Sequence, residues 1–509
     1  MYIRAGNILL FLMLFTTGKA VAAYTYTYSD HCARAYNHFM ALHIAEGRQE
    51  LLLEKKQHPD NLMAVYIADY EDCLVLLMNC NIEDYAQRTG KMAERMQLLD
   101  RGDRSSPWYR FCHAGAYLHR AIINLRFGEQ YKAALHFRKS FALLRENQKL
   151  FPSFEYNNII SGLQEAVVGS LPDSYKWLAA VFGMKGSIKT GTDKLGTFVK
   201  QHNSSDPLYT ETLLYYLYAR FYLLAEQEEV WQMLNSDQYS SKNNLLTTFV
   251  KVNIALDYRK ADDAIALLRT AAADPGFAAY PIFDYQQGMA LLTQCDTGCT
   301  FYFQRYLAHN KSDLFIKDSW QRMALVWHVN GNREKAVYCR RQITAGGTAR
   351  LDADKQAERF ATTGMWPNRA LLQARLLIEG GYNEKALVLL QGIAKGQLQG
   401  AADRSEYCFR LGRVYEELAR KPGGGQYFKQ ALAQYREAMK EGAGRREQYA
   451  ARAALHMGKI YETLNLPAEA LAMYNECLNM PDHDFQNSID QQAKSGINRV
   501  EGNSSTGHQ

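Results

Sequence analysis

One spacing of small and aromatic residues near the end of the chain sets the strongest limit on its fold. Residues 450–477 contain two amphipathic stretches joined by a short turn, followed by Pro481. Six residues define the spacing between them: Met457, Gly458, Tyr461, Ala470, Tyr474 and Cys477. The small residues allow two helices to approach closely, and the larger residues fill the space that remains. The pattern predicts a helical hairpin.

These spacings resemble the tetratricopeptide repeat (TPR), in which helix pairs of about 34 residues stack into a superhelix. The preceding unit repeats them, with an insertion around residues 421–425, at Leu411, Gly412, Tyr415, Ala431, Tyr435 and Ala438. Weaker copies share a nine-residue step across a turn: Leu377 with Ala386, Trp327 with Ala336, Ala255 with Ala264, and Leu125 with Ala134. The expected fold is all-α, a TPR-like helical-hairpin solenoid forming a right-handed superhelix with a helical N-terminal segment.

Two stretches depart from the repeat and set the expected divisions of the chain. Residues 23–110 lack the TPR spacing and end near a turn-rich run at 101–107. Six glycines between Gly162 and Gly196 argue against a regular helix pair there, and this stretch has a weak similarity to the inclusion-body clearance protein family. The expected divisions are a leader (1–22), a helical N-terminal segment (23–110), a hairpin with a Gly-rich break (111–200), degenerate repeats (201–400), C-terminal repeats with a helix capped by Ser488 (401–500) and a disordered tail (501–509).

The first residues have the pattern of a secretory signal peptide. Arg4 precedes an apolar run at 8–15, and small residues follow at Ala20 and Ala22. The run is too short to span a bilayer, which needs about 20 apolar residues. Cys32 lies past the expected cleavage after Ala22, so no lipidation cysteine opens the mature chain. We expect an exported protein, periplasmic or at the outer envelope, with no transmembrane segment and no lipid anchor.

The charge pattern gives no sign of a nucleic-acid partner. Without the leader, 57 basic residues stand against 53 acidic ones, and the two kinds alternate along the chain. A nucleic-acid-binding protein concentrates its basic residues in a patch. No block of five or six like charges is present. The oligomeric state stays open.

Nine cysteines follow the leader, an odd number that leaves at least one thiol unpaired. The one plausible local disulfide joins Cys295 and Cys299, because an Asp-Thr-Gly turn separates them. The alternative is that both are small apolar core residues. No cluster of His, Cys or carboxylate residues at ligand spacing accompanies them, so we expect no metal site.

The sequence carries no catalytic signature. Gly186 to Gly191 lacks the Lys-Ser/Thr ending of a phosphate-binding loop, and no strand is expected before it. Cys112, His113 and His119 are badly spaced to act as a nucleophile and its base. His113 and His119 are six residues apart, so on a helix their side chains point in directions that differ by roughly 120°. We therefore expect no enzyme activity, no catalytic residue and no cofactor.

Tyrosine is the residue type that points towards binding. The chain has 33 tyrosines, and this side chain provides rigid contact area at recognition surfaces. The first helices of TPR pairs line a concave face, which makes six residues candidates for it: Tyr218, Arg220, Arg410, Arg413, Arg452 and His456. Trp177 and Phe182 form a candidate docking patch. The alternative for these residues, and for aromatic residues at helical spacing in general, is core packing.

The resemblance to exported bacterial TPR proteins, which are commonly scaffolds, implies a binding role. We expect a non-enzymatic extracytoplasmic scaffold that holds a protein or peptide partner, with arginines receiving its carboxylates. The alternative is an envelope protein that binds a glycan or another nutrient.

Overall fold

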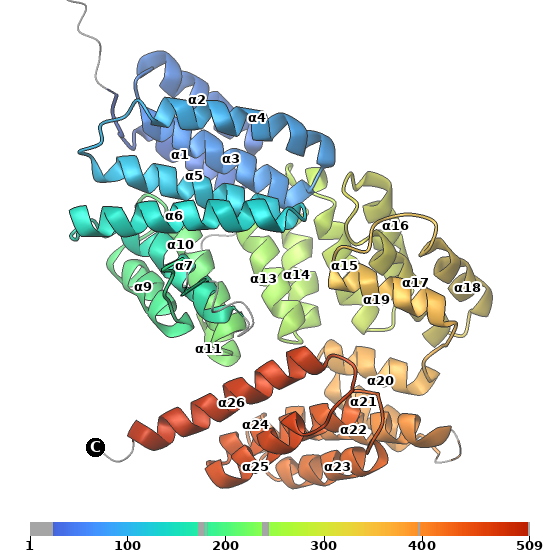
Figure 1. The fold of residues 1–509 in the computed structure, drawn as a ribbon. Coiled ribbons are helices and arrows are strands. Elements are labelled where there is room, and N and C mark those ends of the chain that lie inside the picture. Colours follow the sequence, from blue (N-terminus) through green and yellow to red (C-terminus); the bar gives the residue numbers. More distant parts are fainter. Residues whose placement is uncertain are drawn as a thin grey trace, which may run out of the picture.

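The computed structural model describes residues 24–171, 179–180, 182–236, 244–394, 396 and 398–506. Over these ranges the regular structure is helical, and the one β contact is an isolated bridge between Thr25 and Asn61. Consecutive helices pack against each other in pairs, and the pairs stack along the chain (Figure 1). The all-α helical-hairpin solenoid predicted from the sequence is confirmed.

The helix pairs of the first half begin at Asp30. They are α1 (Asp30–Met40) with α2 (Ile44–Gln57), α3 (Leu62–Asn79) with α4 (Ile82–Leu99), α5 (Pro107–Arg126) with α6 (Gln130–Leu150), and α7 (Asn157–Ser170) with α9 (Ile188–Gln201). α10 (Tyr209–Tyr218) continues into a π-helical turn, η1 (Ala219–Leu223), which packs on α11 (Gln227–Leu234).

The later pairs follow the same plan. They are α13 (Leu245–Asp257) with α14 (Ala261–Ala271), α15 (Ile282–Thr293) with α16 (Cys299–His309), α17 (Ile316–Val329) with α18 (Arg333–Gln342), α20 (Arg369–Glu379) with α21 (Asn383–Gln391), α22 (Gly400–Ala419) with α23 (Tyr427–Glu441), and α24 (Tyr449–Thr463) with α25 (Pro467–Leu478). A 3₁₀ turn, η2 (Phe277–Ala279), precedes α15, α19 (Asp352–Thr363) packs on α17, and α26 (Gln486–Thr506) packs on α24 and α25. The first helices of successive pairs contact one another, and α20, α22 and α24 form one layer.

Glycines bring the helices of the C-terminal pairs together, as the spacing predicts. A Cβ atom built on Gly412 would lie 2.6 Å from the ring of Tyr435, and one on Gly458 would lie 2.5 Å from the ring of Tyr474. Each tyrosine ring therefore fills the space above a glycine of the facing helix. Ala431 is fully buried at the equivalent contact.

The two ends of the Gly-rich stretch belong to a packed helix pair, which corrects the expectation of no regular pair there, while residues 172–178 and 181 lie outside the described residues. α7 and α9 pack closely along their lengths. A Cβ atom built on Gly162 would lie 2.8 Å from the carbonyl oxygen of Gly191, and one on Gly186 would lie 2.6 Å from the Cα atom of Glu165. The prediction counted the conformational cost of glycine and overlooked that missing side chains let two backbones touch.

The nine-residue step between α5 and α6 is shifted by one position from the prediction. Leu125 and Ala134 are exposed, whereas Asn124, Ala133 and Ser140 are buried. The buried hydroxyl of Ser140 donates to the carbonyl oxygen of Ala114, 2.5 Å away, and so links the two helices. Polar residues occupy core positions in this pair, so a search for apolar residues selected the wrong register.

The boundaries predicted at residues 110 and 200 do not divide the core. One apolar cluster runs from Cys32 in α1 to Ala290 in α15. At the other end, Ser488 lies inside α26 and does not cap it, and α26 extends to Thr506 into the predicted tail. The predicted leader lies outside the described residues. No helix in the described part of the chain is long and apolar enough to cross a membrane.

A buried carboxyl in the first half gives a testable pH dependence. Glu211 in α10 is 4% exposed, and the Tyr36 hydroxyl donates to it at 3.3 Å. Burial raises the pKa of Glu211 to about 7. A carboxyl whose pKa is raised on folding stabilises the fold below its usual pKa, and this stability is lost as the pH rises through 7.

We expect Glu211→Gln to stabilise the protein at pH 8 by about 2–3 kcal/mol, with little effect at pH 4.5. Denaturant unfolding at the two pH values measures the difference. Glu476→Gln, at an exposed position on α25, is the matched control. An equal pH dependence in wild type and Glu211→Gln would contradict this assignment.

Candidate protein-binding face

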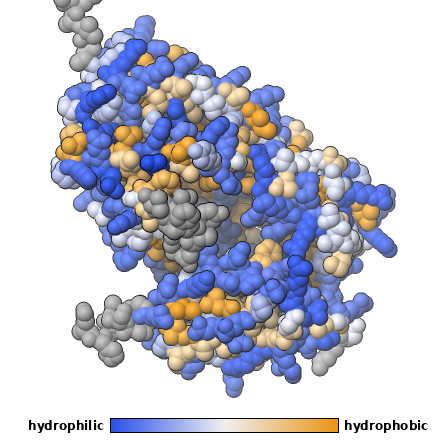
Figure 2. Space-filling model, viewed as in Figure 1, coloured by the Kyte–Doolittle hydropathy of each residue, from blue (hydrophilic) through white to orange (hydrophobic). Residues whose placement is uncertain are grey.

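A hollow separates the C-terminal helices from the middle of the chain. α20–α26 form one end of the molecule, α1–α6 the other, and α13–α19 connect them (Figure 1). The space-filling view is hollowed between these two ends (Figure 2). Polar side chains from α22, α24 and the α13–α14 turn meet in one charge network. We call this set the inner face: Arg259, Arg410, Arg413, Glu416, Glu417, Arg452, His456 and Lys459.

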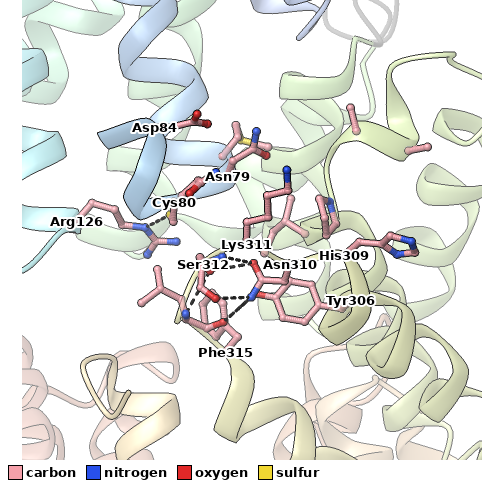
Figure 3. Close-up of a pocket in the computed structure, with 17 residues that line it drawn as sticks. Asn79, Cys80, Asp84, Arg126, Tyr306, His309, Asn310, Lys311, Ser312 and Phe315 are labelled. Atoms are coloured by element: carbon pink, nitrogen blue, oxygen red, sulfur yellow. Dashed lines mark hydrogen bonds between the residues drawn. The ribbon is translucent and has the colours of Figure 1, made fainter. Parts of the chain in front are cut away.

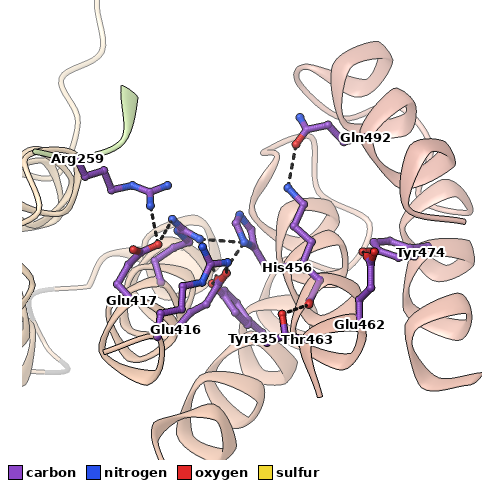
Figure 4. Close-up of polar contacts among 12 residues, drawn as sticks. Arg259, Glu416, Glu417, Tyr435, His456, Glu462, Thr463, Tyr474 and Gln492 are labelled. Carbon is purple, nitrogen blue, oxygen red and sulfur yellow. Dashed lines mark hydrogen bonds and ion pairs between the residues drawn. The ribbon is translucent and has the colours of Figure 1, made fainter. Parts of the chain in front are cut away.

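Arg413 is the centre of the charge network on the inner face. Its guanidinium is 6% exposed and contacts Glu416 at 2.9 Å and Glu417 at 2.8 Å, both on its own helix. It also lies 2.9 Å from Nδ1 of His456 on α24. Glu416 is fully buried and accepts a hydrogen bond from the Tyr435 hydroxyl at 2.5 Å (Figure 4). The network joins α22, α23 and α24.

The contacts within this network determine the protonation states of Glu416 and His456. Burial would raise the pKa of Glu416, but a hydrogen bond with His456 and the charges of Arg413 and Arg420 hold it well below its usual range. Burial lowers the pKa of His456 to about 3. At neutral pH Glu416 is therefore ionised and His456 is uncharged, so the local charge of Glu416 is balanced by arginine.

Arg259 extends the inner face to the middle of the chain. It lies in the α13–α14 turn with a φ of 59°, and its guanidinium is 2.6 Å from Glu417 on α22. A side chain at Gly381, in the α20–α21 turn, would overlap the carbonyl oxygen of Arg259. The two turns therefore pack backbone to backbone. Sequence analysis missed Arg259, because no local pattern pairs it with a residue 158 positions away.

Two cations of the inner face have no carboxylate within ion-pair distance in the described chain. The guanidinium of Arg452 lies 5.8 Å from the centre of the Phe485 ring, and Nζ of Lys459 donates to Gln492 at 3.1 Å. Burial, with the charges of Arg410 and Arg413, lowers the pKa of Arg452. Burial also lowers the pKa of Lys459, to about 8. An incoming carboxylate would relieve this excess of positive charge.

The structure brings four of the six predicted concave-face residues together. Arg410, Arg413, Arg452 and His456 lie on facing turns of α22 and α24, and Arg410 is paired with Glu406 at 2.8 Å. Tyr218 and Arg220 belong to α10 and η1 instead. Tyr218 is 54% exposed, and Arg220 forms an ion pair with Glu226. Among the described residues, no hydrogen bond or ion pair joins those two to α22 or α24.

The other two predicted sites have different outcomes. Trp177 lies outside the described residues, while Phe182 is 41% exposed with the guanidinium of Arg138 4.7 Å from its ring centre. The predicted disulfide is not formed in the structure, where Cys295 and Cys299 are both free thiols. Cys299 begins α16 and is buried in an apolar cluster around Phe303, so it serves as a small core residue.

The residues considered for catalysis face separate partners. His113 contacts Asp100 at 3.0 Å, His119 contacts Asp69 at 2.9 Å, and Cys112 is buried. In the described ranges no three His, Cys, Asp or Glu side chains are placed to hold a metal ion.

Comparison with known proteins adds little to this geometry. No family model matches the chain, and no curated protein matches it. Among solved structures, one that aligns is the crystal structure of the APC/C hetero-tetramer Cut9–Hcn1, with 12% identity over 93% of this chain and 96% of that chain. The TM-score is 0.25, so neither the fold nor the function of this chain is inferred from that likeness.

Proposed function

We propose that this chain is a non-enzymatic extracytoplasmic scaffold whose inner face binds an acidic segment of a protein partner. The observation that carries the proposal is the pair of cations, Arg452 and Lys459, which lie beside the balanced Arg413 network and have no ion-pair partner among the described residues. Export rests on the signal-peptide pattern of residues 1–22.

The inner face suits a carboxylate ligand for two physical reasons. Arg410 and Arg413, which belong to the same face as Arg452 and Lys459, are held by Glu406, Glu416 and Glu417, so this part of the face is fixed before a partner binds. Arg452 and Lys459 are half-buried, where a charge-assisted hydrogen bond is stronger than it would be in water. An extended peptide that places successive carboxylates over α24 would satisfy both cations.

Reversing these two charges is expected to abolish most of the affinity. The double variant Arg452→Glu/Lys459→Glu should bind a fluorescein-labelled peptide of alternating Glu and Ala at least tenfold more weakly than wild type, since two charge-assisted contacts are replaced by repulsion. Fluorescence anisotropy measures the dissociation constants. The same peptide with Gln in place of Glu should bind weakly to both proteins.

Lys429→Glu is the control for a charge reversal elsewhere on the surface, because Lys429 is exposed on α23 and is not part of the inner face. Equal losses in the double variant and the control would show a general charge effect and would sink the proposal. Tight binding of the Gln peptide would have the same consequence.

A further inference from the structure

A second site lies where four segments of the chain meet. A pocket of about 340 Å³ is lined by the α3–α4 turn, the end of α5, the η2–α15 segment and the α16–α17 connection (Figure 3). Cavities of roughly 300 Å³ and above hold small organic molecules. None of its lining residues belongs to the inner face.

One wall presents a fixed guanidinium. Nε of Arg126, the last residue of α5, donates to the thiol sulfur of Cys80 at 3.0 Å. Cys80 ends α3 with a φ of 48°, a conformation that favours glycine, and this turn places its side chain against Arg126. Burial raises the pKa of the Cys80 thiol, so it accepts this hydrogen bond as a neutral group. The terminal nitrogens of Arg126 have no hydrogen-bond partner in the described chain.

The opposite wall is the α16–α17 connection, and its own hydrogen bonds fix its conformation without a ligand. The Asn310 side chain accepts from the backbone nitrogen and hydroxyl of Ser312, at 3.1 and 2.9 Å, and the Tyr306 hydroxyl donates to the carbonyl oxygen of Leu314 at 2.9 Å. These bonds hold the α16–α17 connection in place. Lys311 projects from it and has no carboxylate within ion-pair distance among the described residues, whereas the nearby Asp313 is already paired with Arg350.

The lining combines positive charge, apolar surface and one unsatisfied acceptor. The described lining contains two residues with a permanent positive charge, Arg126 and Lys311, and a single acidic residue, Asp84. Ile282, Leu314 and Phe315 provide apolar surface, and the Asn79 side-chain oxygen is buried without a hydrogen-bond partner. A buried acceptor left unpaired costs free energy, which a ligand with a hydroxyl or amide donor would recover.

We propose that this cavity binds a small organic carboxylate that carries a hydrogen-bond donor at its other end. The carboxylate lies on Arg126 and Lys311, the apolar body contacts Ile282 and Phe315, and the donor reaches Asn79. The site is separate from the inner face, so it adds a small-molecule ligand to a chain proposed to bind protein.

The test uses 3-(4-hydroxyphenyl)propionate as the probe and isothermal titration calorimetry as the measurement. The expected dissociation constant is about millimolar or lower, as the size of this ligand allows. The corresponding amide should bind at least tenfold more weakly. Arg126→Gln should weaken the carboxylate at least tenfold, and Ala279→Phe, which fills the cavity from its exposed rim without changing charge, should remove binding.

Two controls keep the outcome decisive. Arg333→Gln, at an exposed position on α18, should bind as wild type does, and circular dichroism melting should show that Ala279→Phe remains folded. The proposal is overturned if the carboxylate does not bind at 10 mM, roughly ten times the expected constant. Equal binding of the amide, or an equal loss in Arg333→Gln, overturns it too.

Discussion

Replacing Arg413 by alanine is expected to destabilise the C-terminal helix pairs by about 3–5 kcal/mol. The substitution leaves Glu416 fully buried with one arginine fewer, and it removes the contacts to Glu417 and His456. Removing one partner of a buried ion pair is among the largest single-residue costs in a protein, although Arg420 still contacts Glu416 at 2.7 Å. Hydrogen–deuterium exchange of peptides from α22–α25 measures the local loss of stability.

The control is an ion pair at the surface of the same helices. Arg404 contacts Glu441 at 2.9 Å with a half-exposed side chain, so Arg404→Ala should cost less than about 1 kcal/mol. If Arg413→Ala and Arg404→Ala increase exchange equally, the buried network does not stabilise this region. Arg413→Ala in combination with Glu416→Gln should recover part of the loss, because no buried charge is then left alone.

Placing valine at Gly458 is expected to separate α24 from α25 at a cost of about 3 kcal/mol. A Cβ atom at Gly458 would lie 2.5 Å from the Tyr474 ring, and one at Gly496 of α26 would lie equally close to the other side of the same ring. The ring is held between two helices and has no room to move. The expected result is a lower unfolding midpoint for the C-terminal part of the chain, with exchange increased in α24–α26.

Two further variants check the steric reason. Gly458→Val with Tyr474→Leu should recover at least about 1 kcal/mol, since the smaller side chain leaves room for the new methyl groups. Gly90→Ala lies in a helix with open space around the site and should stabilise α4 by about 0.5–1 kcal/mol. Equal destabilisation by Gly90→Ala and Gly458→Val would contradict the packing explanation.

The sequence was informative where small and aromatic residues alternate and misleading where polar residues or glycines form the core. Gly412 and Gly458 predicted their hairpins because each lies opposite a tyrosine. The same reasoning failed at Gly162, where the facing residue is also a glycine, and at Ser140, where a hydroxyl is satisfied by a carbonyl oxygen. Whether a glycine or a serine can lie in the core depends on the residue that it faces on another helix. The local sequence does not identify that residue.

The candidate binding face was partly predictable for a related reason. Arg410, Arg413, Arg452 and His456 were identified because they lie on the first helices of two clear repeats. Arg259 was missed because its partner is on another part of the solenoid, and Lys459 because its lack of a carboxylate is a three-dimensional property. Tyr218 and Arg220 were expected on the same face because the first helices of TPR pairs line it, but they lie in α10 and η1 and no hydrogen bond or ion pair among the described residues joins them to the other four.

The most direct test of the account is quantitative affinity purification from native cell envelopes with three baits: wild type, Arg452→Glu/Lys459→Glu and Lys429→Glu. We predict one protein recovered in about equal molar amount with wild type and with Lys429→Glu, since tight specific binding is close to stoichiometric. That protein should be lost with the inner-face double variant. Identical recovery by all three baits, or thermal stabilisation of the chain by oligosaccharides with no protein recovered, would contradict a protein-binding inner face.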